Sequence, residues 1–257
     1  MDLSPACGLP VSLETDLRLL FTQGLPEVRP QPRTLEELRP VLYNQTAPSP
    51  AIVYWMYRGA GWPADARRAG ALGLRYDLTV LTPERVGGEY PKTFGHHHPP
   101  MPGSTRTYPE LYQVVLGTAH CLMQRPPDDG RPDEVVVVEA GPGQLILIPP
   151  GYAHLTINRG PDPLVLANWV AEGFTADYEA FRRRRGAAYY EVEHEGRAYF
   201  VPNGHYSDPP RPRLVEPLSP AHLGLEPGEP LYQACRRDPE RLAFLSDPGR
   251  EVPPAGN

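Results

Sequence analysis

The sequence predicts an all-β fold, a barrel or sandwich of short antiparallel strands with a few peripheral helices. Between residues 51 and 169, short runs rich in β-branched and aromatic residues follow one another, and Gly, Pro or Asp stands in nearly every gap. The 257 residues include 35 prolines and 24 glycines, which are scattered between these runs and form no repeat. Many short strands joined by tight turns are typical of such a pattern.

The chain divides into a core and two ends. We expect residues 1–50 to form an arm that packs on the barrel, with a helix over residues 34–42 that Thr34 caps. Residues 51–205 hold the barrel strands, among them the run YPKTFGHHH, then a helix around residues 175–185 and a hairpin. Residues 206–257 form a Pro-rich extension with a helix over 239–245, expected to wrap the core or a partner subunit.

Composition excludes several classes of protein. No apolar run approaches the roughly 20 residues of a membrane span, and MDLSPACGLP lacks the features of a signal peptide, so we expect a soluble, cytoplasmic protein with no membrane partner. A net charge of −6 argues against a nucleic-acid partner. Cys7, Cys121 and Cys235 predict reduced thiols, and the arginines at 182–185 predict the solvated face of a short helix.

A first cluster of polar residues lies in TFGHHH (93–98) and in ELYQVVLG (110–117). Side chains alternate along a strand, so His96 and His98 share one face while His97 points away. Glu110 and Tyr112 share a face of the following strand. Two imidazoles and a carboxylate on adjacent strands are three ligands for a divalent metal, although the histidine triplet alone fits a solvated loop equally well.

A second motif supports the metal site. The run GQLILIPPGYAHLTIN (143–158) matches G-x5-P-x-G-x2-H-x3-N at every specified position. This pattern resembles the second motif of the cupins, whose fold is a double-stranded β-helix or jelly-roll barrel. The resemblance implies that His154 is the fourth ligand, beside His96, His98 and Glu110.

The first motif departs from the usual cupin form. Three or four residues ordinarily separate the second histidine from the glutamate, whereas eleven lie between His98 and Glu110. The inserted PPMPGSTRTYP is rich in turn formers, so we expect it to loop out and return the chain to the barrel. The spacing from Glu110 to Gly117 again matches the motif.

Four segments indicate one particular family of cupins: VYWMY (53–57), TVLTPERVGGEYPKTFGHHH (79–98), ELY (110–112) and DYEAF (177–181). From about residue 34 to about 205 the chain resembles the cupin-type glucose-6-phosphate isomerases, first associated with archaea. The resemblance implies a homodimer that acts on a phosphorylated hexose and holds one divalent metal ion per subunit, with iron(II) first and manganese, nickel or zinc as alternatives. It also implies substrate contacts from five residues: Tyr54, Thr79, Thr93, Gly95 and Tyr112.

Strict alternation would place Thr93 and Gly95 on the face opposite His96, so only a twist or bulge brings them to the site. For the substrate phosphate, the available donors are Thr93, the Gly95 N–H, Tyr54 and Lys92, the only lysine of the chain.

Isomerisation of an aldose to a ketose moves hydrogen between C2 and C1 of the sugar. Glu110 is the candidate proton shuttle, and a direct hydride shift is the other route. Two other functions suit the same ligands: an iron-dependent cupin dioxygenase and a non-catalytic sugar-binding cupin.

Overall fold

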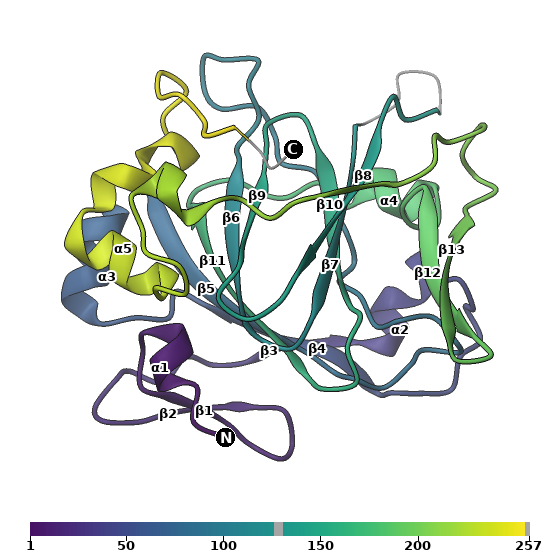
Figure 1. Ribbon diagram of the computed structural model, residues 1–257, viewed down its shortest axis with the longest axis horizontal. Coiled ribbons are helices and arrows are strands. Elements are labelled where there is room, and N and C mark those ends of the chain that lie inside the picture. Colours follow the sequence, from purple (N-terminus) through teal and green to yellow (C-terminus); the bar gives the residue numbers. More distant parts are fainter. Residues whose placement is uncertain (126–130, 255–257) are drawn as a thin grey trace.

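The computed structural model describes residues 1–125 and 131–254 and is built on two sheets that face each other (Figure 1). The first is a six-stranded antiparallel sheet in the order β3 (Gln31–Thr34), β4 (Ile52–Arg58), β5 (Leu74–Leu81), β11 (Leu164–Ala171), β6 (Glu110–Leu116) and β9 (Leu145–Ile148). The second has four strands in the order β10 (Ala153–Asn158), β7 (Ala119–Gln124), β8 (Val135–Ala140) and β14 (Arg213–Val215). This is the jelly-roll barrel predicted for a cupin.

Apolar side chains form two cores. The inner core lies between the sheets and includes Leu81 and Leu166 from one sheet and Leu122 from the other. The outer core covers the far face of the six-stranded sheet, where Trp55 and Trp169 pack against residues from both chain ends. All eight residues of β11 are buried because one face lines the barrel and the other is covered, which explains the unbroken apolar run.

The helices are short and lie outside the barrel. They are α1 (Ser4–Cys7), α2 (Leu35–Leu38), η1 (Arg39–Val41), α3 (Pro63–Gly70), α4 (Glu179–Arg183), η2 (Pro220–Leu223), α5 (Leu231–Arg237) and η3 (Pro239–Leu245), where η marks a 3-10 helix. Thr34 and Glu37 form the expected capping box, but the α-helix ends at Leu38 and continues as a 3-10 turn around Pro40, which has no N–H to donate. Among the described residues, no helix has the length and apolarity to cross a bilayer.

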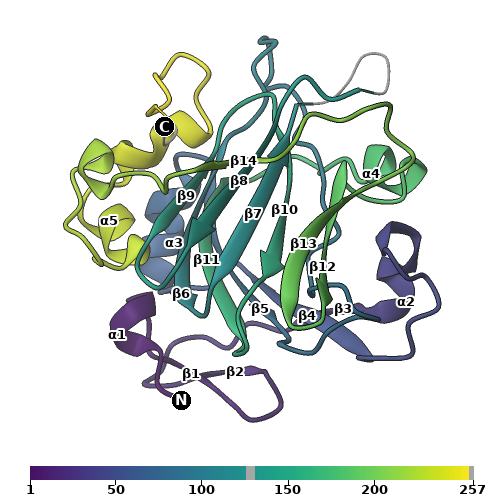
Figure 2. The ribbon, with the colours of Figure 1, turned by 45° about the vertical axis from the view of Figure 1, so that its right-hand side comes forward.

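Both chain ends contribute to the sheets. In the N-terminal end, β1 (Val11–Leu13) pairs with β2 (Leu19–Phe21), and β3 adds an edge strand beside β4. In the C-terminal end, β14 pairs in parallel with β8, and α5 and η3 pack near α3 (Figures 1 and 2). The described part of residues 206–257 therefore packs on the chain's own barrel.

Three local expectations need correction. The run YPKTFGHHH forms isolated bridges to β10 and to Asp177 instead of a regular strand. The helix expected around residues 175–185 is confined to α4, and the one expected over 239–245 is a 3-10 helix. The cysteines are free and buried, as predicted, and Arg182 and Arg183 are exposed on α4.

A buried polar group fastens the hairpin of β12 (Tyr189–His194) and β13 (Arg197–Pro202) to the barrel (Figure 2). His120 of β7 lies 2.9 Å from Glu191 through Nδ1 and 2.7 Å from Glu139 through Nε2. Arg159 lies 3.1 Å from the other oxygen of Glu191, and Phe200 stacks on the imidazole. Burial alone lowers the pKa of His120, but the carboxylates of Glu191 and Glu139 outweigh burial and raise this pKa.

We expect His120→Gln to destabilise the fold more at low pH than at high pH. A histidine whose pKa is raised by folding stabilises the protein fully below its unfolded pKa, ordinarily 6.5, and this contribution is lost as pH rises through the folded pKa. The loss in free energy of unfolding near pH 6 should be about 1–3 kcal/mol. Urea denaturation at pH 6 and pH 9 measures it, with His194→Gln at the exposed end of β12 as control. Equal losses at both pH values would contradict the assignment.

Candidate metal centre

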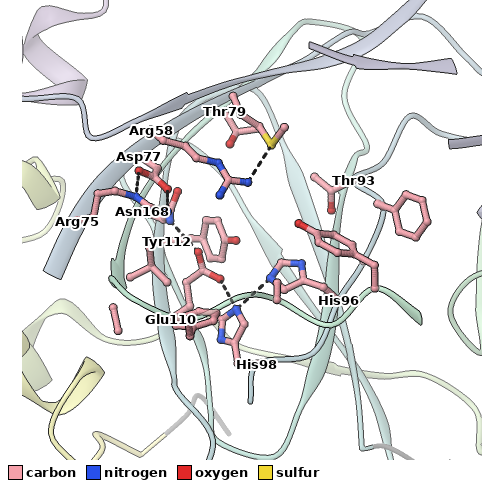
Figure 3. Close-up of a pocket in the computed structure, with 18 of the residues that line it drawn as sticks. Arg58, Arg75, Asp77, Thr79, Thr93, His96, His98, Glu110, Tyr112 and Asn168 are labelled. Atoms are coloured by element: carbon pink, nitrogen blue, oxygen red, sulfur yellow. Dashed lines mark hydrogen bonds and ion pairs between the residues drawn. The ribbon is translucent and has the colours of Figure 1, made fainter. Parts of the chain in front are cut away.

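Three elements bring the predicted ligands together. Glu110 begins β6, His154 is the second residue of β10, and His96 and His98 lie in the irregular segment 91–98. His96 and His154 exchange two backbone hydrogen bonds of 3.1 Å, so their side chains emerge side by side. Figure 3 shows His96, His98 and Glu110 converging at the pocket.

The ligand atoms of the four residues all lie within 4.8 Å of one another. The Nε2 atoms of His96 and His98 are 3.0 Å apart, and Glu110 Oε2 is 3.2 Å from His154 Nε2 and 3.4 Å from His98 Nε2. Two ligands bonded at about 2.1 Å to one ion are about 3.0 to 3.4 Å apart for octahedral or tetrahedral angles. These three separations therefore fit ligands of a single divalent ion.

Two polar atoms at the centre of this cluster lack a hydrogen-bond partner. Glu110 Oε2 and His154 Nε2 are buried, and neither has a hydrogen-bond partner, although they lie close to each other. An unsatisfied buried polar atom is costly unless a ligand or ion satisfies it. Three imidazoles and one carboxylate, with two central atoms unsatisfied, fit a divalent transition metal.

Neighbouring groups fix the orientation of two ligands. The backbone oxygen of Tyr108, in the inserted loop, lies 2.9 Å from His98 Nδ1 and leaves Nε2 facing the cluster. Asn168 of β11 donates a 2.7 Å hydrogen bond to Glu110 Oε1 and leaves Oε2 for the centre. Such second contacts set the tautomer and the angle of a ligand.

The electrostatics favour the ligand forms of these groups. Burial lowers the pKa of His96 well below its ordinary value, and His154 and His98 add to the effect, so the imidazole stays neutral. Burial alone raises the pKa of Glu110, but His154 and His98 outweigh it and hold this pKa well below the usual range. A neutral His96 imidazole and a Glu110 carboxylate are the forms that bind a metal ion.

The substrate residues implied by the resemblance line the same pocket as the ligands. They are Tyr54 on β4, Thr79 on β5, Thr93 and Gly95 in segment 91–98, and Tyr112 on β6. Burial raises the pKa of Tyr112 well above its ordinary value, and Glu110 raises it further, so the phenol keeps its proton.

Gly95 brings Thr93 to the ligand side, which strict alternation did not predict. The backbone of Gly95 has a φ of +84°, in the left-handed region, so period-2 alternation does not apply to the segment. A Cβ atom at this position would lie 2.6 Å from Phe181 Cε1, closer than packing allows.

A family model covers more than half of the chain. The family model described as glucose-6-phosphate isomerase matches residues 33–207. The chain belongs to this family. The match contains segment 91–98, β6 and β10, and hence all four candidate ligands.

Named relatives of this isomerase family agree. The glucose-6-phosphate isomerase of Thermococcus kodakarensis is 26% identical over 204 residues, which is 77% of this chain and 97% of the relative. That of Thermococcus onnurineus is 24% identical over 79% of this chain and 97% of its own length.

Solved structures align over shorter parts of the chain. An oxalate oxidase in complex with glycolate is 17% identical and aligns over 41% of this chain and 43% of its own, with a TM-score of 0.30. The oxalate decarboxylase of Bacillus subtilis is 16% identical over 48% of this chain and 28% of its own, with a TM-score of 0.34.

Lys92 was predicted as a phosphate donor, and this is wrong. Its side chain is 3% exposed, and its ammonium group pairs with Glu89 and faces the ring of Tyr190 at 4.7 Å, outside the pocket. Sequence reasoning also missed four polar pocket residues: Arg58, Arg75, Asp77 and Asn168. Alternation from Tyr54 and Thr79 could have found the first three, and a lone polar residue inside PLVLANWV could have marked the last.

We expect His97→Ala to keep the metal and His98→Ala to lose it. The backbone of His97 pairs with Asp177, and its ring faces Phe181 instead of the cluster. Removal of one buried ligand should weaken metal binding by at least about 10-fold. Elemental analysis after loading with manganese(II) and gel filtration measures it, and equal metal loss in both variants would contradict the ligand set.

Proposed function

We propose that this protein is a metal-dependent isomerase that interconverts glucose 6-phosphate and fructose 6-phosphate. The supporting observation is the cluster of His96, His98, Glu110 and His154, which opens into a pocket with hydroxyl donors, in a chain that belongs to the glucose-6-phosphate isomerase family.

We propose that these four residues hold one divalent ion per subunit, with iron(II) as the first choice because three imidazoles and one carboxylate suit it. When bound, such an ion acts as a Lewis acid that polarises the sugar carbonyl and stabilises negative charge on the adjacent oxygens. The active metal is identified by loading the protein separately with manganese(II), nickel(II), zinc(II) or iron(II) and comparing the isomerase activity of each form.

Glu110 is the proposed proton shuttle. Its Oε2 atom points into the pocket while Asn168 holds Oε1, so the carboxylate has one defined orientation toward a bound sugar. A carboxylate there takes the proton from C2 and returns it at C1, although metal ligation competes with its basicity. Tyr112, two residues along β6, presents a protonated phenol that donates to a sugar oxygen.

Four residues are proposed to orient the substrate: Tyr54, Thr79, Thr93 and Gly95. The hydroxyl oxygen of Thr93 accepts a 3.0 Å hydrogen bond from Thr156 N, and the hydroxyl of Tyr54 accepts one of 3.3 Å from Phe94 N. Each hydroxyl proton is therefore left to donate to a ligand. Donors held in this way position the sugar without losing much freedom on binding.

We expect metal-loaded protein to convert fructose 6-phosphate into glucose 6-phosphate without oxygen. Glu110→Gln keeps the shape but removes the proton acceptor, so turnover should fall about 10² to 10⁴-fold at normal metal content. Glucose 6-phosphate is measured by a coupled dehydrogenase under anaerobic conditions, with metal content determined for each variant.

The outcomes separate the candidate reactions. Turnover that requires oxygen would indicate a dioxygenase, and binding without product would indicate a sugar-binding cupin. In heavy water, proton transfer introduces solvent deuterium at the sugar carbon, whereas a hydride shift does not. Full turnover by metal-loaded Glu110→Gln would exclude Glu110 as the shuttle.

We also propose that the protein is a cytoplasmic homodimer. Tyr43 and Tyr199 are 52% and 45% exposed and line one hollow beside β13, an apolar surface that a single chain leaves open. Light scattering at micromolar concentration should give twice the 28.5 kDa chain mass, and the monomer mass would contradict the dimer. Cys7, Cys121 and Cys235 are free thiols, which supports a cytoplasmic location because that compartment keeps cysteines reduced. Cell fractionation tests the location.

A further inference from the structure

Two arginines line the pocket, and they differ in what holds them. Arg75 on β5 makes a two-pronged interaction with Asp77, with Nε and a terminal nitrogen each 2.8 Å from a carboxylate oxygen. Asp77 also accepts a 2.9 Å hydrogen bond from Gly59 N. The charge of Arg75 is therefore offset by a carboxylate that is itself fixed in place.

Arg58, the last residue of β4, has no such partner. Its backbone pairs with Asp77 across β4 and β5, and the one side-chain hydrogen bond of its guanidinium within the described part of the chain is a 3.8 Å contact to the sulfur of Met56. Among the described residues it forms no ion pair with Asp or Glu. Figure 3 shows its guanidinium group pointing toward the centre of the pocket.

The strand register places this guanidinium beside a hydroxyl of the substrate wall. Met56 pairs directly with Thr79 across β4 and β5, and both side chains line the pocket. Because Arg58 reaches back to Met56, its donors lie on the Thr79 side of the pocket, as Figure 3 also shows. A cation and a hydroxyl are thus available to one anionic group.

We propose that Arg58 is a specificity-determining residue that binds the phosphate group of the substrate. The proposal rests on the proposed function and adds a binding residue to it. A sugar phosphate brings a charge of about −1.5 to −2 at pH 7, and hydroxyls alone do not neutralise it. The planar fork of an arginine donates two parallel hydrogen bonds to phosphate oxygens.

Arg75, Lys92 and His96 each have other partners. Arg75 is held by Asp77, and Lys92 is buried against Glu89 and does not line the pocket. His96 belongs to the metal cluster. Arg58 is the pocket-lining cation of the described chain that can meet the phosphate without breaking an ion pair.

The test compares Arg58→Ala and Arg58→Lys with Arg67→Ala, an exposed arginine on α3 that lies outside the pocket. Arg58→Ala should raise KM for fructose 6-phosphate about 10-fold and leave kcat nearly unchanged, because it removes binding made equally to substrate and transition state. Arg58→Lys should have a KM between those of Arg58→Ala and the unsubstituted protein, since lysine keeps the charge but cannot donate two parallel hydrogen bonds. Arg67→Ala should behave as the unsubstituted protein.

A second measurement uses inorganic phosphate alone. It should inhibit turnover and raise the melting temperature of the unsubstituted protein and of Arg67→Ala, and both effects should weaken in Arg58→Ala by a factor similar to the rise in KM. Since Arg58 is exposed, the variants should melt at the same temperature without phosphate.

Two results would overturn the proposal. One is an Arg58→Ala variant that matches Arg67→Ala in KM and in its response to phosphate. The other is a raised KM with an unchanged response to phosphate, which would mean that Arg58 contacts the sugar or shapes the pocket. If the unsubstituted protein made no glucose 6-phosphate, the proposed function would fail, and the melting experiment would still decide whether Arg58 binds phosphate.

Discussion

The reciprocal backbone hydrogen bonds between His96 and His154 are the contact on which the rest of the site depends. They join an irregular segment to a regular strand and place two imidazoles with ring centroids 4.4 Å apart. Segment 91–98 is otherwise held by single bridges, such as that between Lys92 and Ile157. A slip of one residue in this pairing would turn His96 away from the cluster, because neighbouring side chains point to opposite faces.

The C-terminal extension supports the sheet that carries Glu110. Gln113 of β6 donates to the backbone oxygen of Glu229 at 2.9 Å and accepts from Leu231 N at 2.7 Å. The indole of Trp169 donates to Leu231 O at 3.2 Å. The C-terminal extension therefore stabilises the outer face of the strands that bear Glu110 and Asn168.

The inserted loop 99–109 links the same extension to a metal ligand. The guanidinium of Arg106 donates to the backbone oxygens of three C-terminal residues at 3.1 to 3.4 Å: Phe244, Asp247 and Pro248. Two residues further on, the backbone oxygen of Tyr108 accepts a 2.9 Å hydrogen bond from His98 Nδ1. The eleven-residue insertion thus replaces the short turn of the usual motif with a loop that Arg106 joins to the C-terminal extension and whose Tyr108 orients His98.

By itself, the sequence determined the all-β class and predicted the four candidate ligands, because alternation and the motif G-x5-P-x-G-x2-H-x3-N depend on local spacing. Its resemblance to the glucose-6-phosphate isomerases is confirmed by the family match over residues 33–207. It also placed Thr34 as a helix cap, since capping needs only residues three apart. The position of Thr93 in the pocket was decided by the tertiary structure, because the backbone of Gly95 has a positive φ and alternation applies only to extended strands. The tertiary structure also decided which cation faces the pocket. Lys92 lies near Glu89 along the chain, but only the folded barrel buries that pair, and Arg58 lines the pocket. Burial and pairing depend on contacts between segments that are distant in the sequence.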